Sequence, residues 1–174
     1  MVTVAKKENA KSASTSVHEN MKKGLALSFL VIPIGVVLWV ILWRFGFIAS
    51  VVSFAMAWLA VYLYGVGAKA PVSRRVAPYL LGIIAVGVLV AFVAGIASDA
   101  ADFYVKDTDM SQWGALLAPE YWAYFADNLF NNGELISSYL GDLAISVVFA
   151  LIGCFSIVKG LFTPTEVVDT PKSK

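Results

Sequence analysis

Residues Leu42 to Ser50 read LWRFGFIAS, and this stretch decides how the chain can fold. Arg44 is the only charged residue between Gly24 and Ala68. An arginine at the centre of a span over residues 34–54 would cost ~3 kcal/mol. It would also leave flanking apolar runs of 10 and 14 residues, below the ~20 that a membrane helix needs. We therefore predict that Arg44-Phe45-Gly46 is the tip of a hairpin between two complete spans, with Gly46 suited to a left-handed turn.

Uncharged runs on either side of this tip predict four membrane spans. The chain has 174 residues, of which 59% are hydrophobic and 14% are charged, whereas soluble domains are nearer a quarter charged. Lys23 and Arg44 enclose an uncharged run of 20 residues, and Arg44 and Lys69 enclose one of 24. Arg75 and Asp99 enclose a run of 23, and Asp142 and Lys159 enclose one of 16. We predict an all-α integral membrane protein, an antiparallel bundle with spans at about residues 24–43, 46–66, 77–97 and 139–158.

The basic residues predict the orientation of these spans. Eleven of the 13 Lys and Arg lie in the two tails and the loop between spans two and three: Lys6, Lys7, Lys11, Lys22, Lys23, Lys69, Arg74, Arg75, Lys159, Lys172 and Lys174. By the positive-inside rule, both termini are cytoplasmic. The four-span domain over residues 24–162 then lies between polar cytoplasmic tails at residues 1–23, expected to be disordered, and 163–174.

Small residues at four-residue spacing predict where the spans pack closely, because lipid provides no hydrophobic drive for helix association. Such residues occur in spans two to four: Ala49, Ser53 and Ala57; Gly87, Ala91 and Gly95; and Ser146, Ala150 and Cys154. They fit packing within one bundle, and a homodimer interface on one ridge is the alternative. In the first span, Pro33 and Gly35 predict a kink.

The segment over residues 98–138 is predicted to lie outside the cell. Within it, Pro119 can begin a helix and Asn131-Asn132-Gly133 can end it. Trp122, Phe125 and Leu129 share one apolar face of this helix. We expect it to lie flat on the outer membrane surface, and the alternative is a docking helix for an extracellular partner.

Acidic residues are concentrated around the same segment. Asp99 and Asp102 are three residues apart on one helix face, and Asp107 and Asp109 form a D-x-D pair. The order of oxygen ligands that a calcium loop requires is absent, so we expect these carboxylates to keep the outer face hydrated.

Asp142 differs because the run that follows it is too short to span a membrane comfortably. If the helix starts earlier, at Leu135, Asp142 lies inside the membrane and needs a cationic partner. Arg44 is the predicted partner and Lys106 the second choice.

The first hairpin, IGVVLWVILWRFGFIASVVSFAMAWLAVYLYG, resembles an uncharacterised family of small multispanning membrane proteins of Gram-positive bacteria. The closing stretch, YLGDLAISVVFALIGCFSIVK, is similar to the last span of that family. The resemblance implies a multi-pass protein of the bacterial plasma membrane. It carries over no functional residue.

The sequence holds one cysteine and one histidine, His18 in a polar tail, so we expect no enzyme activity, metal site or cofactor. Nucleic-acid binding is not expected, because anionic lipid explains the basic residues. We predict a non-catalytic membrane protein that contacts the lipid bilayer and either a second copy of itself or another envelope protein. The alternative is a small transporter or channel component that uses Asp142 as an intramembrane carboxylate.

Overall fold

The computed structural model describes residues 19–45 and 50–162, and all its regular elements are helices. They are α1 (Met21–Ser28), α2 (Val31–Arg44), α3 (Val51–Ala68), α4 (Ala77–Tyr104), α5 (Gln112–Leu117), α6 (Pro119–Asn131) and α7 (Gly133–Phe162). Four segments are long and apolar enough to cross a membrane: Met21–Arg44, Val51–Ala68, Ala77–Tyr104 and Gly133–Phe155. The chain is thus an all-helical protein with the make-up of a multi-pass membrane protein.

The helices extend beyond the predicted spans. α4 continues to Tyr104, past the expected end at residue 97, and α7 begins at Gly133, ahead of the expected start at 139. Residues 21–23, predicted to belong to a disordered tail, form the first turn of α1, where the Asn20 side chain accepts a hydrogen bond from the Lys23 amide. The predicted tails at 1–18 and 163–174, and the turn glycine Gly46, lie outside the described residues.

The predicted kink in the first span is confirmed, and it falls between α1 and α2. The Pro33 ring excludes a helical hydrogen bond to the carbonyl of Phe29, four residues earlier. That carbonyl accepts from the Ile32 amide instead, which tightens the chain locally. The break therefore precedes the proline by one turn.

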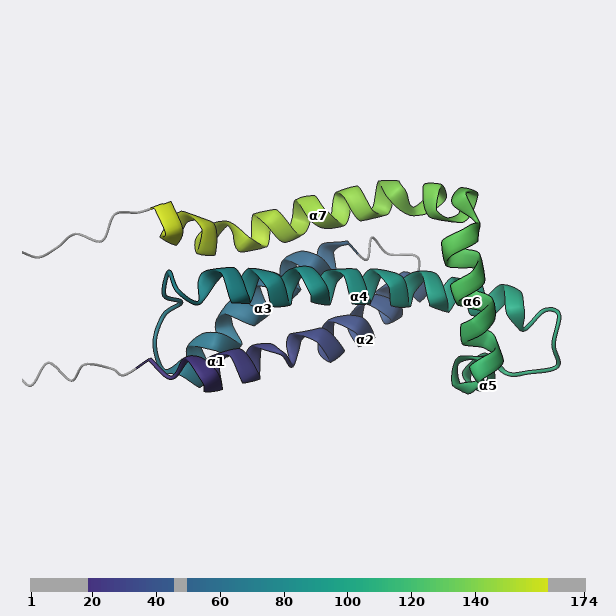
Figure 1. Ribbon diagram of the computed structural model, residues 1–174, viewed down its shortest axis with the longest axis horizontal. Helices are drawn as coiled ribbons and strands as arrows, with labels where there is room; N and C mark the ends of the chain where they lie inside the picture. Colours follow the sequence, from purple (N-terminus) through teal and green to yellow (C-terminus); the bar gives the residue numbers. More distant parts are fainter. Residues whose placement is uncertain (1–18, 46–49, 163–174) are drawn as a thin grey trace, which may run out of the picture.

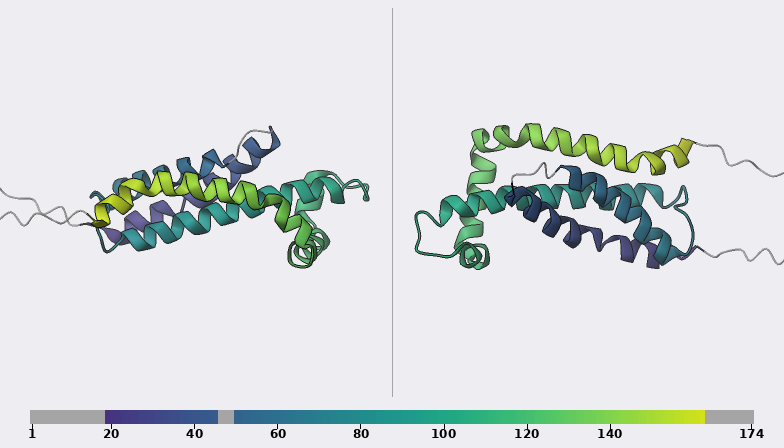
Figure 2. Two further views of the ribbon diagram at one scale, coloured as in Figure 1. Left: turned by 90° about the horizontal axis from the view of Figure 1, so that it is seen from above. Right: turned by 180° about the vertical axis from the view of Figure 1, so that it is seen from behind.

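α4 is the central helix. Figures 1 and 2 show it running between α7 on one side and α2 on the other. α2 packs against α4, α1 packs against α3, and α3 packs against α7. One end of the molecule, the terminal end, holds the start of α1, the α3–α4 connection and the end of α7 (Figure 1). The opposite end, the α6 end, holds α5 and α6.

The small residues lie at the helix contacts within a single chain. Ser53, Ala57, Gly87, Ala91, Gly95 and Ser146 are buried, and Ala150 is half-buried. A side-chain carbon at Gly153 of α7 would lie 2.7 Å from Ala57 Cβ, and one at Gly67 would lie 2.6 Å from the Lys23 carbonyl oxygen. The helices therefore approach as closely as their backbones allow. Ala49 lies outside the described residues.

α6 crosses the direction of the long helices at one end of the molecule (Figure 1). Pro119 occupies its first turn and it ends at Asn131, so the predicted helix is confirmed. The Tyr121 hydroxyl donates a hydrogen bond to the Ala97 carbonyl in α4, and the Trp122 indole N–H donates to the Leu116 carbonyl at 2.9 Å. These two bonds attach α6 to α4 and to the end of α5.

Candidate functional site

Polar side chains from four helices meet at the α6 end. One face of α4 supplies Ser98, Asp99 and Asp102, because residues three and four apart lie on the same side of a helix. The other members are Trp43 and Arg44 at the end of α2, Gln112 in α5 and Tyr139 in α7. We call this set the polar clamp.

Arg44 forms the charged half of the clamp. Its Nη1 lies 2.9 Å from Asp102 Oδ2, and its Nη2 lies 3.3 Å from Asp102 Oδ1, so the guanidinium contacts both carboxylate oxygens. Its Nε donates to Ser98 Oγ at 2.8 Å. Charge-assisted bonds in this forked geometry are among the stronger polar contacts in proteins. They fix the end of α2 against α4.

This geometry corrects the predicted pairing of Arg44 with Asp142. α2 packs along α4, which continues past the predicted span and brings Asp102 beside the guanidinium. α7 packs against α3 and α4 instead, and Asp142 is exposed on α7. The second predicted partner, Lys106, lies over the ring of Phe103 with its Nζ 4.8 Å from the ring centre.

Asp99 forms the second half of the clamp. Its Oδ2 accepts from Trp43 Nε1 at 2.9 Å and from the Tyr139 hydroxyl at 3.0 Å. The rings of Trp43 and Tyr139 lie 5.9 Å apart, so the two donors also contact each other. One carboxylate thereby joins α2, α4 and α7.

Gln112 connects the clamp to the short helix α5. Its amide nitrogen donates to Asp102 Oδ1, the oxygen that also faces Arg44. At the same end of α5, the hydroxyl of the N-cap residue Ser111 accepts from the Gly114 amide at 3.1 Å. The clamp therefore positions α5, and through α5 it positions α6.

Asp142 lies on the exposed surface of α7, one helical turn from Tyr139. At a rise of 1.5 Å per residue, it is about 4.5 Å further along the helix than the Tyr139–Asp99 contact. Its backbone carbonyl accepts from Ser146 Oγ at 2.6 Å. Within residues 19–45 and 50–162, no hydrogen bond or ion pair reaches its carboxylate.

The predicted docking face of α6 is turned inward. Phe125 is only 4% exposed, and Leu129 packs against the same core. Trp122 is 47% exposed, yet its N–H is occupied within the protein. The apolar periodicity that predicted the helix marks the face that packs on α4 and α7, as it does in most amphipathic helices. Besides Trp122, the exposed large side chains of α5 and α6 are Trp113, Leu117, Tyr124 and Phe130.

The ionisable groups of the clamp are engaged in contacts between helices. Outside the clamp, burial raises the pKa of Tyr121 in α6 to about 12, so this phenol stays a hydrogen-bond donor at neutral pH. Among the described residues, no three His, Cys, Asp or Glu side chains come together as a metal site. Each acidic group of the clamp is held by donors from neighbouring helices.

Sequence reasoning placed Asp99 and Asp102 on one helix face but missed Ser98, Trp43, Gln112 and Tyr139. The available signal was the change from apolar to polar residues at the end of the third span, where Ser98, Asp99 and Asp102 lie in one turn. No local pattern shows that the polar atoms of Trp43 and Tyr139 reach the same carboxylate oxygen.

No protein-family model, curated protein or solved structure matches this chain. The resemblance to a family of Gram-positive membrane proteins stays a prediction.

Proposed function

We propose that this protein is a non-catalytic, multi-pass protein of the bacterial plasma membrane that acts through helix packing and contacts with another envelope protein. In this proposal its four apolar helices form an antiparallel bundle, and both termini are cytoplasmic. α5 and α6 then form a platform on the outer surface.

The distribution of charge supports this orientation. The terminal end carries Lys22, Lys23, Lys69, Arg74, Arg75 and Lys159 among the described residues. The connection between α4 and α7 carries one basic residue, Lys106, beside several carboxylates. The positive-inside rule places the terminal end in the cytoplasm. An alkaline phosphatase fusion after Asp109 should be active, and an inactive fusion that is stably expressed would reverse the orientation.

The polar clamp is the observation that carries the functional proposal. Its charged groups bind one another and fix α5 and α6 across the α6 end, so they are occupied in building a surface. That surface exposes large apolar side chains, including Phe130 at 80% and Leu117 at 84%. Rigid exposed aromatic groups supply much of the contact energy in protein interfaces.

Site-specific photo-crosslinking in intact cells tests this proposal. We expect a crosslinker at Tyr124 or Phe130 to yield a discrete protein adduct. The matched control is Val86 in α4, which is also exposed but lies in the middle of a span. Adducts with lipid alone at all three positions would contradict a protein-binding platform.

A transporter or channel component is the second candidate. It is favoured by the Asp142 carboxylate, which forms no hydrogen bond or ion pair within the part of the chain that the structure describes. Proton-coupled transport commonly uses such a carboxylate. Asp142→Asn should then abolish flux in proteoliposomes while leaving the thermal stability unchanged. Equal flux in the wild type and the variant would remove Asp142 from any transport role.

A further inference from the structure

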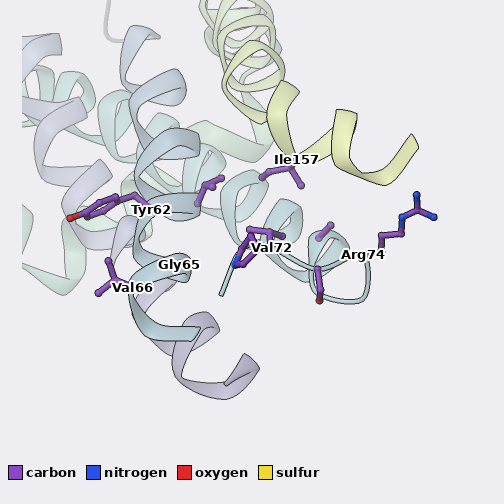
Figure 3. A pocket seen from close by; sticks show the side chains of 10 residues that line it. Tyr62, Gly65, Val66, Val72, Arg74 and Ile157 are labelled. Atoms are coloured by element: carbon purple, nitrogen blue, oxygen red, sulfur yellow. The ribbon is translucent and has the colours of Figure 1, made fainter. Parts of the chain in front are cut away.

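A pocket of about 540 Å³ lies at the terminal end, between α3, α7 and the connection that leads into α4 (Figure 3). Its wall is mostly apolar. The residues that define it are Tyr62, Gly65, Val66, Val72, Arg74 and Ile157. The pocket lies away from the polar clamp and belongs to none of its contacts.

Gly65 keeps the pocket open. A side-chain carbon built at this residue meets no atom within 4 Å. Gly67, two residues along the same helix, is in contrast closed off by the Lys23 carbonyl. α3 therefore presents one glycine to its helix partner α1 and another to the empty pocket.

Polar groups lie at one side of this apolar wall. Ser73 Oγ is buried and has no hydrogen-bond partner among the described residues. Arg74 follows it, and Figure 3 shows its side chain on the opposite side from Tyr62 and Val66, with the guanidinium extending outward at the rim of the pocket. Arg74 already has an interaction within the protein. A guanidinium has five N–H donors, so it can serve that interaction and an anionic oxygen together.

Tyr62 closes the opposite side of the pocket. Its ring stacks on Trp58 at 5.6 Å between centres, and both rings are more than half exposed. Trp58 lies near the middle of the span Val51–Ala68, so the pair extends the apolar wall into the hydrocarbon region, whereas Ser73 and Arg74 lie beyond the end of this span. The pocket thus joins an apolar chamber to a cationic rim at headgroup depth.

We propose that this pocket binds an anionic phospholipid of the inner leaflet. Its phosphate meets Arg74 and provides an acceptor for the Ser73 hydroxyl, and one acyl chain lies over Gly65 beside Val66 and Ile157. Basic pockets between membrane helices on the cytoplasmic side bind such headgroups. The assignment to the inner leaflet rests on the proposed orientation, whereas the lipid chemistry rests on the pocket alone.

Native mass spectrometry of the delipidated protein in detergent tests the proposal. Phosphatidylglycerol should bind about tenfold more tightly than phosphatidylcholine, because both carry the phosphodiester but the quaternary ammonium of phosphatidylcholine competes with Arg74 for it and is repelled by the guanidinium. Arg74→Gln should remove this preference, and the matched control Arg75→Gln, outside the pocket wall, should keep it. An equal loss in both variants would show general surface charge and overturn the site.

A second pair of variants, Gly65→Leu and its control Gly82→Leu, tests the apolar part of the pocket. Gly65→Leu should fill the pocket and reduce binding of both lipids at least tenfold. Gly82→Leu places the same side chain at another open helical glycine and should leave binding unchanged. Both variants should unfold at wild-type temperature or above. Retained lipid in Gly65→Leu, or equal binding of glycerol phosphate without acyl chains, would overturn the proposal.

This assay is independent of the proposed function. Lipid binding in detergent requires neither the membrane orientation nor a partner on α6. An inactive phosphatase fusion after Asp109, together with preferential binding of phosphatidylglycerol, would reject the orientation and keep the lipid site. An active phosphatase fusion after Asp109, together with equal binding of the two lipids, would keep the orientation and reject the lipid site.

Discussion

Arg44 and Asp102 face each other across the ends of α2 and α4, with 2.9 Å between Nη1 and Oδ2, and they make the charged contact of the polar clamp. Asp99, one turn earlier in α4, accepts from Trp43, the neighbour of Arg44. Two successive residues of α2 thus meet two carboxylates on one face of α4. This arrangement sets both the rotation and the register of the two helices.

A double-mutant cycle tests the ion pair. Arg44→Gln and Asp102→Asn should each lower stability, and their coupling should be about 1 kcal/mol, since both side chains are partly exposed (33% and 46%). Thermal or denaturant unfolding in detergent measures it. Arg44→Gln with Asp142→Asn is the control and should be additive. Coupling to Asp142 in place of Asp102 would contradict the geometry.

Tyr139→Phe removes one donor to Asp99 without changing the ring. It should cost about 1 kcal/mol of unfolding free energy, the usual net contribution of one hydrogen bond. Tyr79→Phe is the matched control, since Tyr79 is 64% exposed, and it should have no effect. If Tyr139→Phe keeps full stability even in the Trp43→Phe background, Asp99 does not join α7 to the clamp.

Two glycines of α3 have different surroundings: Gly67 is closely packed, whereas Gly65 faces open space. Gly67→Ala places a methyl group against the Lys23 carbonyl and should destabilise the protein by about 1–3 kcal/mol. Gly65→Ala meets nothing and should be neutral or slightly stabilising, because alanine favours helix. Unfolding temperatures of the two variants make the comparison. Equal temperatures would mean that α1 and α3 do not pack at Gly67.

Lys69 ends α3 with a positive φ of 54°, a conformation that favours glycine. Lys69→Gly should raise the unfolding free energy by about 1 kcal/mol. Lys69→Ala removes the same charge and keeps the strained conformation, so it should not stabilise. A gain of equal size in both variants would assign the effect to charge and not to the backbone.

Stability at alkaline pH should depend on Tyr121. Burial raises its pKa from 10.0 to about 12, so the unfolded phenol loses its proton first. The stabilisation is complete below about pH 10 and is lost as the pH rises toward 12. Wild-type stability should therefore fall more steeply over this range than that of Tyr121→Phe. Parallel profiles would mean that Tyr121 is not buried in solution.

Much of the helical layout was predictable from the sequence, because a lipid-exposed backbone must satisfy its hydrogen bonds within helices and long uncharged runs mark where such helices lie. Asp142, which lies inside α7, is the exception. The helix beginning at Pro119 was predictable for a similar local reason, since proline suits the first turn. The partner of Arg44 was not predictable. Asp102 and Asp142 are both acidic residues near a span end, and sequence distance does not say which helix lies beside α2.

By itself, the sequence determined where helices form, that four of them are apolar enough to span a membrane, and which residues are small enough for close packing. These properties depend on composition and on neighbours within a few turns. Only the tertiary structure decided that Arg44 pairs with Asp102, that Trp43 and Tyr139 share Asp99, that Phe125 faces inward, and that Gly65 opens a pocket. These outcomes depend on how each helix is rotated about its axis, and that rotation is fixed by the combined contacts of all its neighbours.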